Sequence, residues 1–77
     1  MSSRESIAWQ CASIARAHGL TVREQEVLEL LALDMTNAQI AEAMVVSAGT
    51  VKTHVSHLCH KLGVTSRTEA VELVRKA

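Results

Sequence analysis

Residues 36–62 read TNAQIAEAMVVSAGTVKTHVSHLCHKL and contain two helical patterns separated by a short turn. Within the patterns, apolar residues recur at steps of three or four: Ile40, Ala41, Met44, Val51, Val55, Leu58 and Leu62. Thr36 and Ser47 stand immediately before the two patterns, where a hydroxyl group can cap a helix. The segment therefore predicts a short helix over 37–44, a tight turn and a longer helix over 48–62, which is the arrangement of a helix-turn-helix.

Three more helices are predicted around this pair. A capping box, in which a Ser or Thr accepts from the N–H three residues on and a Glu or Gln there reaches back, is expected at Thr21, Thr36 and Ser66. Gly19 and Gly63 stand where a left-handed residue would end a helix. These signals place helices at 4–18, 22–33, 37–44, 48–62 and 67–76. The sequence therefore predicts an all-α fold with short connections.

The composition excludes several classes of function. With 77 residues, the chain can form one domain with a modest core but no catalytic domain beside it. Trp9 is its only aromatic residue, so a platform that stacks unpaired bases cannot form. No apolar run approaches the roughly 20 residues that span a bilayer. Cys11 and Cys59 form no Cys-x-x-Cys pair, and reduced thiols of this kind fit a cytoplasmic protein.

Charge is distributed unevenly, although the formal net charge is zero. Residues 24–42 include five acidic side chains and no Lys or Arg. Residues 45–68 instead carry Lys52, Lys61, Arg67 and three histidines, with no acid. Phosphate binding depends on the local potential of one face, so this basic half predicts a nucleic-acid partner.

The side of helix 48–62 opposite its apolar stripe has an unusual composition. At about 100° per residue, this outer arc collects small, polar or basic residues: Gly49, Lys52, Thr53, Ser56, His57 and His60. A helix that faces only water normally mixes Glu with Lys, whereas a helix that enters the major groove must keep carboxylates away from phosphates. The acid-free arc therefore predicts a DNA-reading helix.

Many fixed motifs of the chain carry a family resemblance. They are LTVRE at 20–24, EVL at 26–28, LLA at 30–32, TN at 36–37, IA at 40–41, Ser47, TVK at 50–52, His54, KLGV at 61–64, SR at 66–67 and EAV at 69–71. Together, from about Leu20 to Val74, they resemble the LuxR-type (GerE-like) DNA-binding domain of bacterial transcriptional regulators. The resemblance implies a compact four-helix helix-turn-helix bundle over 20–77. The extra helix within 1–19 would then be a linker from a missing sensor or receiver domain.

The resemblance also implies partners and contact residues. Such regulators bind double-stranded DNA as homodimers, and RNA polymerase is a further expected partner. The expected contacts are Lys52, Thr53 and Ser56 at bases and nearby phosphates, Thr50, Asn37 and Lys61 at the DNA backbone, and His57 and His60 at phosphate or water. Two residues depart from the family pattern. Asp34 replaces the usual Gly after the second helix and must accept a left-handed conformation, and Ser56 is shorter than the basic side chain of some relatives.

A metal site and a catalytic site are the two alternatives to a DNA-binding surface. His54, His57, His60 and Cys59 could suggest a metal site, but side chains three residues apart on a helix diverge, and structural zinc needs four converging ligands. The carboxylates within 24–29 form no catalytic assembly, because Glu24 already serves as a cap. We therefore expect no catalysis, no metal and no other cofactor.

The ends of the chain predict contacts with other proteins. Helix 67–76 is apolar over a wide arc, and Ala70, Val71 and Val74 suffice to seat it on the bundle. Leu73 and Ala77 would then face outward and form a homodimer interface. Trp9 lies away from the apolar stripe of its helix, and two readings stay open: contact with a missing domain, or packing onto the helical body.

Overall, the sequence predicts sequence-specific binding of duplex DNA through the major groove, in the output domain of a bacterial transcriptional regulator. Two alternatives remain at this point. A promoter-reading segment of a sigma factor would carry a similar helix-turn-helix. A helical protein-interaction module that binds no DNA would share the core pattern, although the acid-free arc argues against it.

Overall fold

The structure is a computed structural model that describes residues 3–77. Its described residues form five helices and no strand: α1 (Ser3–His18), α2 (Val22–Ala32), α3 (Asn37–Met44), α4 (Ala48–Leu62) and α5 (Arg67–Lys76). The predicted all-α class is confirmed, and each helix end lies within one residue of its predicted position. No helix of this part of the chain is long and apolar enough to cross a membrane.

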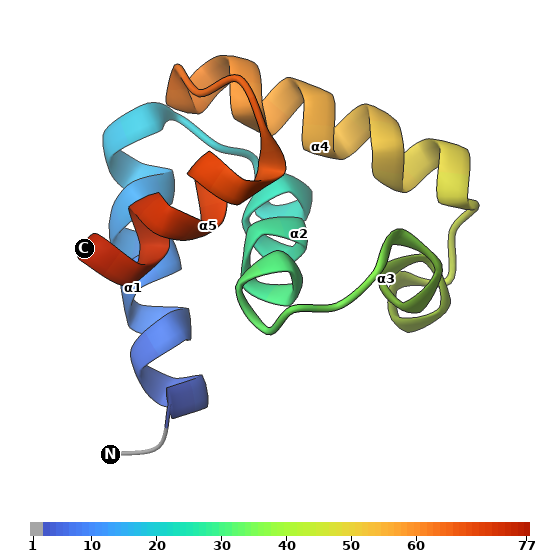
Figure 1. Ribbon diagram of the computed structural model, residues 1–77, viewed down its shortest axis with the longest axis horizontal. Helices are drawn as coiled ribbons and strands as arrows, with labels where there is room; N and C mark the ends of the chain where they lie inside the picture. The colour runs from blue at the N-terminus through green and yellow to red at the C-terminus, as the bar shows by residue number, and fades with distance from the viewer. Residues whose placement is uncertain (1–2) are drawn as a thin grey trace.

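Helix α2 is the centre of the arrangement and packs against all four other helices. In Figure 1, α1 and α5 lie together on one side of α2, α4 runs across the end of the bundle, and α3 lies on the far side from α1. Fully buried side chains from all five helices meet around α2: Cys11, Val27, Leu28, Leu31, Ile40, Val51, Leu58, Ala70 and Val74. This core leaves α3 and the N-terminal half of α4 projecting as a separate corner of the fold.

Local hydrogen bonds start the helices largely as predicted. At Thr21 and Thr36 both halves of the capping box are present. At Ser66 only half of the predicted box forms: Ser66 Oγ accepts from Glu69 N–H at 3.2 Å, but the Glu69 carboxylate turns to Thr65. Thr65 offers both a backbone N–H and a hydroxyl at 3.0 and 2.9 Å. The Glu69 carboxylate therefore accepts two hydrogen bonds from Thr65 in place of one from the N–H of Ser66.

Left-handed residues follow the first four helices. Gly19 and Gly63 adopt φ of +67° and +71°, as predicted, and Asp34 accepts the same region at φ 61°. Val45 is also left-handed, at φ 56°, and is 89% exposed, which no feature of the sequence predicted. A β-branched residue is strained in this conformation. The left-handed backbone of Val45 allows the chain to reverse sharply between α3 and α4.

The outer face of α5 differs from the prediction. Leu73 does not simply face outward; it is half-buried and packs against the core, as Val71 does. Helix α1 lies close beside α5, so the wide apolar arc of α5 is partly covered from within the same chain. Ala77 is exposed as expected, and its backbone oxygen accepts a hydrogen bond from Gln10 Nε2 at 3.0 Å.

Helix α1 is an integral part of this core, since Cys11, Ile14 and Ala15 are buried. Trp9 points the other way and is 66% exposed, so packing onto the helical body is the wrong reading of this residue. Contact of Trp9 with another domain stays a prediction.

Candidate nucleic-acid interface

Helices α3 and α4 form the predicted helix-turn-helix. Ile40 and Ala41 of α3 and Val51 of α4 are buried between the helices and the core, and Met44 and Val46 pack beside them. The N–H of Val46 donates to the carbonyl oxygen of Ala41 at 3.0 Å and holds the turn against α3. The apolar residues selected from the sequence therefore fix the orientation of α4.

The opposite side of α4 is open to solvent. All six predicted α4 contact residues before Lys61 are exposed: Thr50, Lys52, Thr53, Ser56, His57 and His60. None of the ion pairs within the described part of the chain involves Lys52, so the Lys52 charge is not offset by a salt bridge. Thr53 Oγ1 donates to the carbonyl oxygen of Gly49 at 3.1 Å. The Thr53 hydroxyl can therefore accept a hydrogen bond from a ligand, and the Thr53 methyl group can make an apolar contact.

Lys61, at the far end of α4, has partners inside the chain. Its Nζ donates to Glu24 Oε1 at 2.7 Å and to the carbonyl oxygen of Gly19 at 3.3 Å. The Lys61 side chain is 36% exposed, whereas that of Glu24 is only 6% exposed. The sequence singled out Glu24 as a cap and Lys61 as a DNA contact, and the structure joins the two residues. Lys61 is thus partly neutralised before any phosphate approaches.

This pairing sets the ionisation of Glu24. Burial raises the pKa of the Glu24 carboxyl, but hydrogen bonds from Lys61 and Thr21, with the Lys61 charge, outweigh burial and hold the pKa below its usual value. A lowered pKa in the folded state means that the carboxylate stabilises the fold at neutral pH. This contribution is lost as the pH falls below the usual pKa and through the lowered one.

We expect Glu24→Gln to lower the free energy of unfolding by about 1–2 kcal/mol at neutral pH, because it removes a charge-assisted hydrogen bond from Lys61. The deficit relative to the wild type should shrink as the pH is lowered through the acid range of a carboxyl group. Urea unfolding at a series of pH values measures it. Glu26→Gln is the matched control, since the Glu26 ion pair with Arg23 is exposed and should contribute little. A deficit that does not change with pH would contradict the assigned role.

Asn37 and Arg67 are also joined. Arg67, the first residue of α5, donates through Nη1 to Asn37 Oδ1 at 2.9 Å and through Nη2 to the carbonyl oxygen of Met35. The sequence placed Arg67 among the free cations of the basic half. The structure instead uses its guanidinium to connect α5 with the start of α3.

Comparison with known proteins agrees with this geometry. The family model described as bacterial regulatory proteins, LuxR family, matches residues 18–74. The chain belongs to this family. The resemblance carried by the motifs is therefore confirmed, and the alternative of a sigma-factor segment is set aside.

Curated relatives of this LuxR-family domain differ greatly in length. The spore germination protein GerE of Bacillus subtilis (strain 168) is 49% identical over 57 residues, which are 73% of this chain and 77% of GerE. The HTH-type transcriptional regulator MalT of Yersinia pestis (strain Pestoides F) is 42% identical over 67 residues, 87% of this chain but only 7% of MalT. The MalT match is too long to lie wholly after residue 17, so it extends into α1. No solved structure matches the chain.

The thiols and histidines of the family domain are not grouped for metal binding. Among residues 3–77, no three His, Cys, Asp or Glu side chains are placed to hold a metal ion. Burial raises the pKa of the Cys11 thiol to about 12, with a further contribution from Glu29. Burial also raises the pKa of Cys59, aided by Glu69. Burial therefore favours the protonated thiol at both cysteines.

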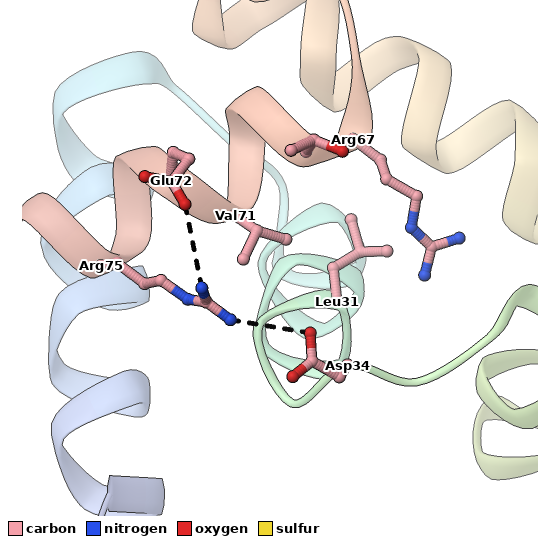
Figure 2. Close-up of a pocket in the computed structure, with 7 residues that line it drawn as sticks. Leu31, Asp34, Arg67, Val71, Glu72 and Arg75 are labelled. Carbon is pink, nitrogen blue, oxygen red and sulfur yellow. Dashed lines mark ion pairs between the residues drawn. The ribbon is translucent and has the colours of Figure 1, made fainter.

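A hollow lies on the side of α5 that faces the end of α2. Figure 2 shows this hollow, of about 310 Å³, with Arg75 between Asp34 at 3.7 Å and Glu72 at 3.8 Å. The guanidinium of Arg67, which also lines it, points away from Arg75. Arg75 is thus already paired with two acids, and the Arg67 guanidinium is turned toward Asn37 and Met35. The exposed face of α4 remains the candidate site.

Proposed function

We propose that this LuxR-family domain binds a specific sequence of duplex DNA by placing α4 in the major groove, and that it is the output domain of a bacterial transcriptional regulator. One observation supports the proposal above all: the exposed face of α4 carries Lys52 and several short polar side chains but no acid. The major groove of B-DNA is wide enough to admit one α-helix.

We assign different roles to the residues of this interface. Lys52, Thr53 and Ser56 lie on the exposed side of α4 and would contact base edges and nearby phosphates. Since the Thr53 hydroxyl hydrogen is used within the helix, Thr53 would accept from an exocyclic amino group or contact a thymine methyl. The remaining contacts would be to the DNA backbone: Thr50, Asn37, Lys61, His57 and His60. No residue is assigned a catalytic role, and the function needs no cofactor.

Salt dependence of binding tests the proposal. If Lys52, Lys61, Arg67 and helix N-termini together neutralised three or four phosphates per protomer, as the sequence alone predicts, the slope of log affinity against log salt would be about −3 to −4. Because Lys61 and Arg67 have partners within the chain, we expect a shallower slope of about −1 to −2. Fluorescence anisotropy on duplex DNA over a salt series measures it. A slope of zero, or no binding at low salt, would favour a protein-interaction module instead.

We also propose that the domain dimerises on DNA through the outer part of α5, with Leu73 and Ala77 in the interface. Leu73 is half-buried and supports the core, so a charge there would disturb the fold. The exposed Ala77 is the cleaner position for a test. Ala77→Glu should place like charges across the two-fold axis and reduce cooperative occupancy of two half-sites about one helical turn apart, by about tenfold or less.

Gel shifts on paired and single half-sites would measure this effect. Single half-site affinity should stay unchanged in Ala77→Glu, because the C-terminus lies on the opposite side of the molecule from α3 and the N-terminal end of α4 in Figure 1. Unchanged cooperativity would place the dimer contact elsewhere, with the surface around Trp9 as the next candidate.

The two cysteines bear on the cellular compartment of the domain. We propose a cytoplasmic protein, since Cys11 and Cys59 are both free thiols and reduced cysteines are typical of that compartment. RNA polymerase and a sensor or receiver domain are the further partners we propose for the whole regulator.

A further inference from the structure

Arg67 makes two long-range hydrogen bonds to the segment that opens the helix-turn-helix. Its Nη1 donates to Asn37 Oδ1 at 2.9 Å, and its Nη2 donates to the carbonyl oxygen of Met35. Asn37 is the first residue of α3, and Met35 lies in the connection that leads into it. The planar guanidinium therefore binds the residue before and the residue after the Thr36 cap, with two donors in fixed geometry.

The first of these bonds determines which way the Asn37 amide faces. A guanidinium group has only donors and no acceptor. Asn37 must therefore present its carbonyl oxygen to Arg67, and its NH₂ group must turn to the other side of the amide plane. No hydrogen bond within the described residues uses Asn37 Nδ2 as a donor. Asn37 is only half-buried, so these two N–H groups are available to a ligand.

We infer that Arg67 is a positioning residue for DNA binding: it holds the Asn37 amide so that Nδ2 donates to a phosphate oxygen of the DNA backbone. The inference rests on the proposed function, because it assigns a role within that interface. Arg67 acts through Asn37 and does not itself neutralise a phosphate. This distinguishes it from Lys52, whose ammonium makes neither an ion pair nor a hydrogen bond within the described residues, whereas the Arg67 guanidinium donates to Asn37 and Met35.

A double-mutant cycle tests the inference. Arg67→Ala and Asn37→Ala should each lower the affinity for one DNA half-site by about three- to tenfold, the range of a single hydrogen bond. The double variant should bind no more weakly than Asn37→Ala, since Arg67 has nothing left to position. Arg75→Ala is the matched control on α5, because Arg75 is bound to Asp34 and Glu72 and should leave affinity unchanged.

Two further variants keep the test sharp if Arg67→Ala unfolds the domain. Arg67→Lys keeps the charge but loses the planar fork, so it should bind as weakly as Arg67→Ala. If Arg67 instead bound a phosphate directly, lysine would supply the same charge and the affinity would be largely restored. Asn37→Asp keeps an acceptor for Arg67 but removes the NH₂ donors, so its melting temperature should not fall while its DNA affinity drops at least as far as in Asn37→Ala.

The salt slope separates the possible outcomes. It should be the same in Arg67→Ala and the wild type, because no phosphate loses a charge partner. A slope shallower by about one unit would show that Arg67 contacts phosphate directly and would overturn the inference. Losses that multiply in the double variant, or full affinity in Asn37→Asp, would overturn it as well. In these cases the wild type still binds DNA, whereas a wild type that binds no duplex at all removes the proposed function together with the inference.

Discussion

Lys52→Glu is expected to lower the affinity for a single DNA half-site by roughly 100-fold, the largest effect of any single exposed residue. Lys52 lies on the exposed side of α4 and is not offset by an ion pair in the described chain. The substitution removes a favourable contact of about 1–3 kcal/mol. It also brings a carboxylate toward the phosphates, and their repulsion adds to the loss of binding free energy. At about 1.4 kcal/mol per tenfold change, a total near 3 kcal/mol corresponds to that loss.

The matched control for this charge reversal is Lys76→Glu. Lys76 is also exposed, and it lies at the C-terminal end of α5, far from the N-terminal end of α4 in Figure 1. Both variants change the net charge equally, so any general electrostatic effect is shared. Anisotropy titrations of a single half-site compare them, with circular dichroism to show that both are folded. Equal losses in the two variants would mean that α4 is not the DNA-reading helix.

The fold could be predicted well because its signals are local. The Thr21 and Thr36 caps involve partners only three residues away, and a helix stripe needs only the period of the chain. Gly19 and Gly63 likewise report a backbone conformation that the residue itself favours. Helix bounds and the buried side of α4 therefore follow from sequence chemistry alone.

What could not be predicted depends on long-range pairing. The Glu24–Lys61 and Asn37–Arg67 pairs join residues 37 and 30 positions apart, and nothing in the local sequence marks them as partners. The composition of the 45–68 half therefore showed where cations are abundant but not which of them are free. Charge complementarity between residues 24–42 and 45–68 was the only available signal, and it names no pair.

Smaller misses have the same origin in competition between local options. Glu69 could reach back to Ser66 or Thr65, and the second donor on Thr65 decided the outcome. Val45 adopts a left-handed conformation that its own preferences oppose, because the packing of α3 against α4 requires the turn there. Leu73 was expected on the surface because Ala70, Val71 and Val74 suffice to seat α5 on the bundle, yet α1 also packs beside α5 and partly covers Leu73.

Ile40→Ala is the change with the largest expected effect on stability. The Ile40 side chain is fully buried and belongs to the core cluster. Truncation should lower the free energy of unfolding by about 2–5 kcal/mol, through lost burial and the cavity left behind. For a small domain with a total of about 5–15 kcal/mol, that is a large share.

The position of Ile40 also predicts where the damage appears first. Helix α3 packs mainly against α4 and less against α2, so Ile40 is its main anchor in the core. Urea unfolding measures the global loss, and hydrogen exchange should show the amides of α3 opening before those of α2. Ile7→Ala is the matched control, because Ile7 is only half-buried on α1 and should cost clearly less. Equal losses in the two variants, or uniform exchange across α2 and α3, would mean that Ile40 does not anchor the helix-turn-helix to the core.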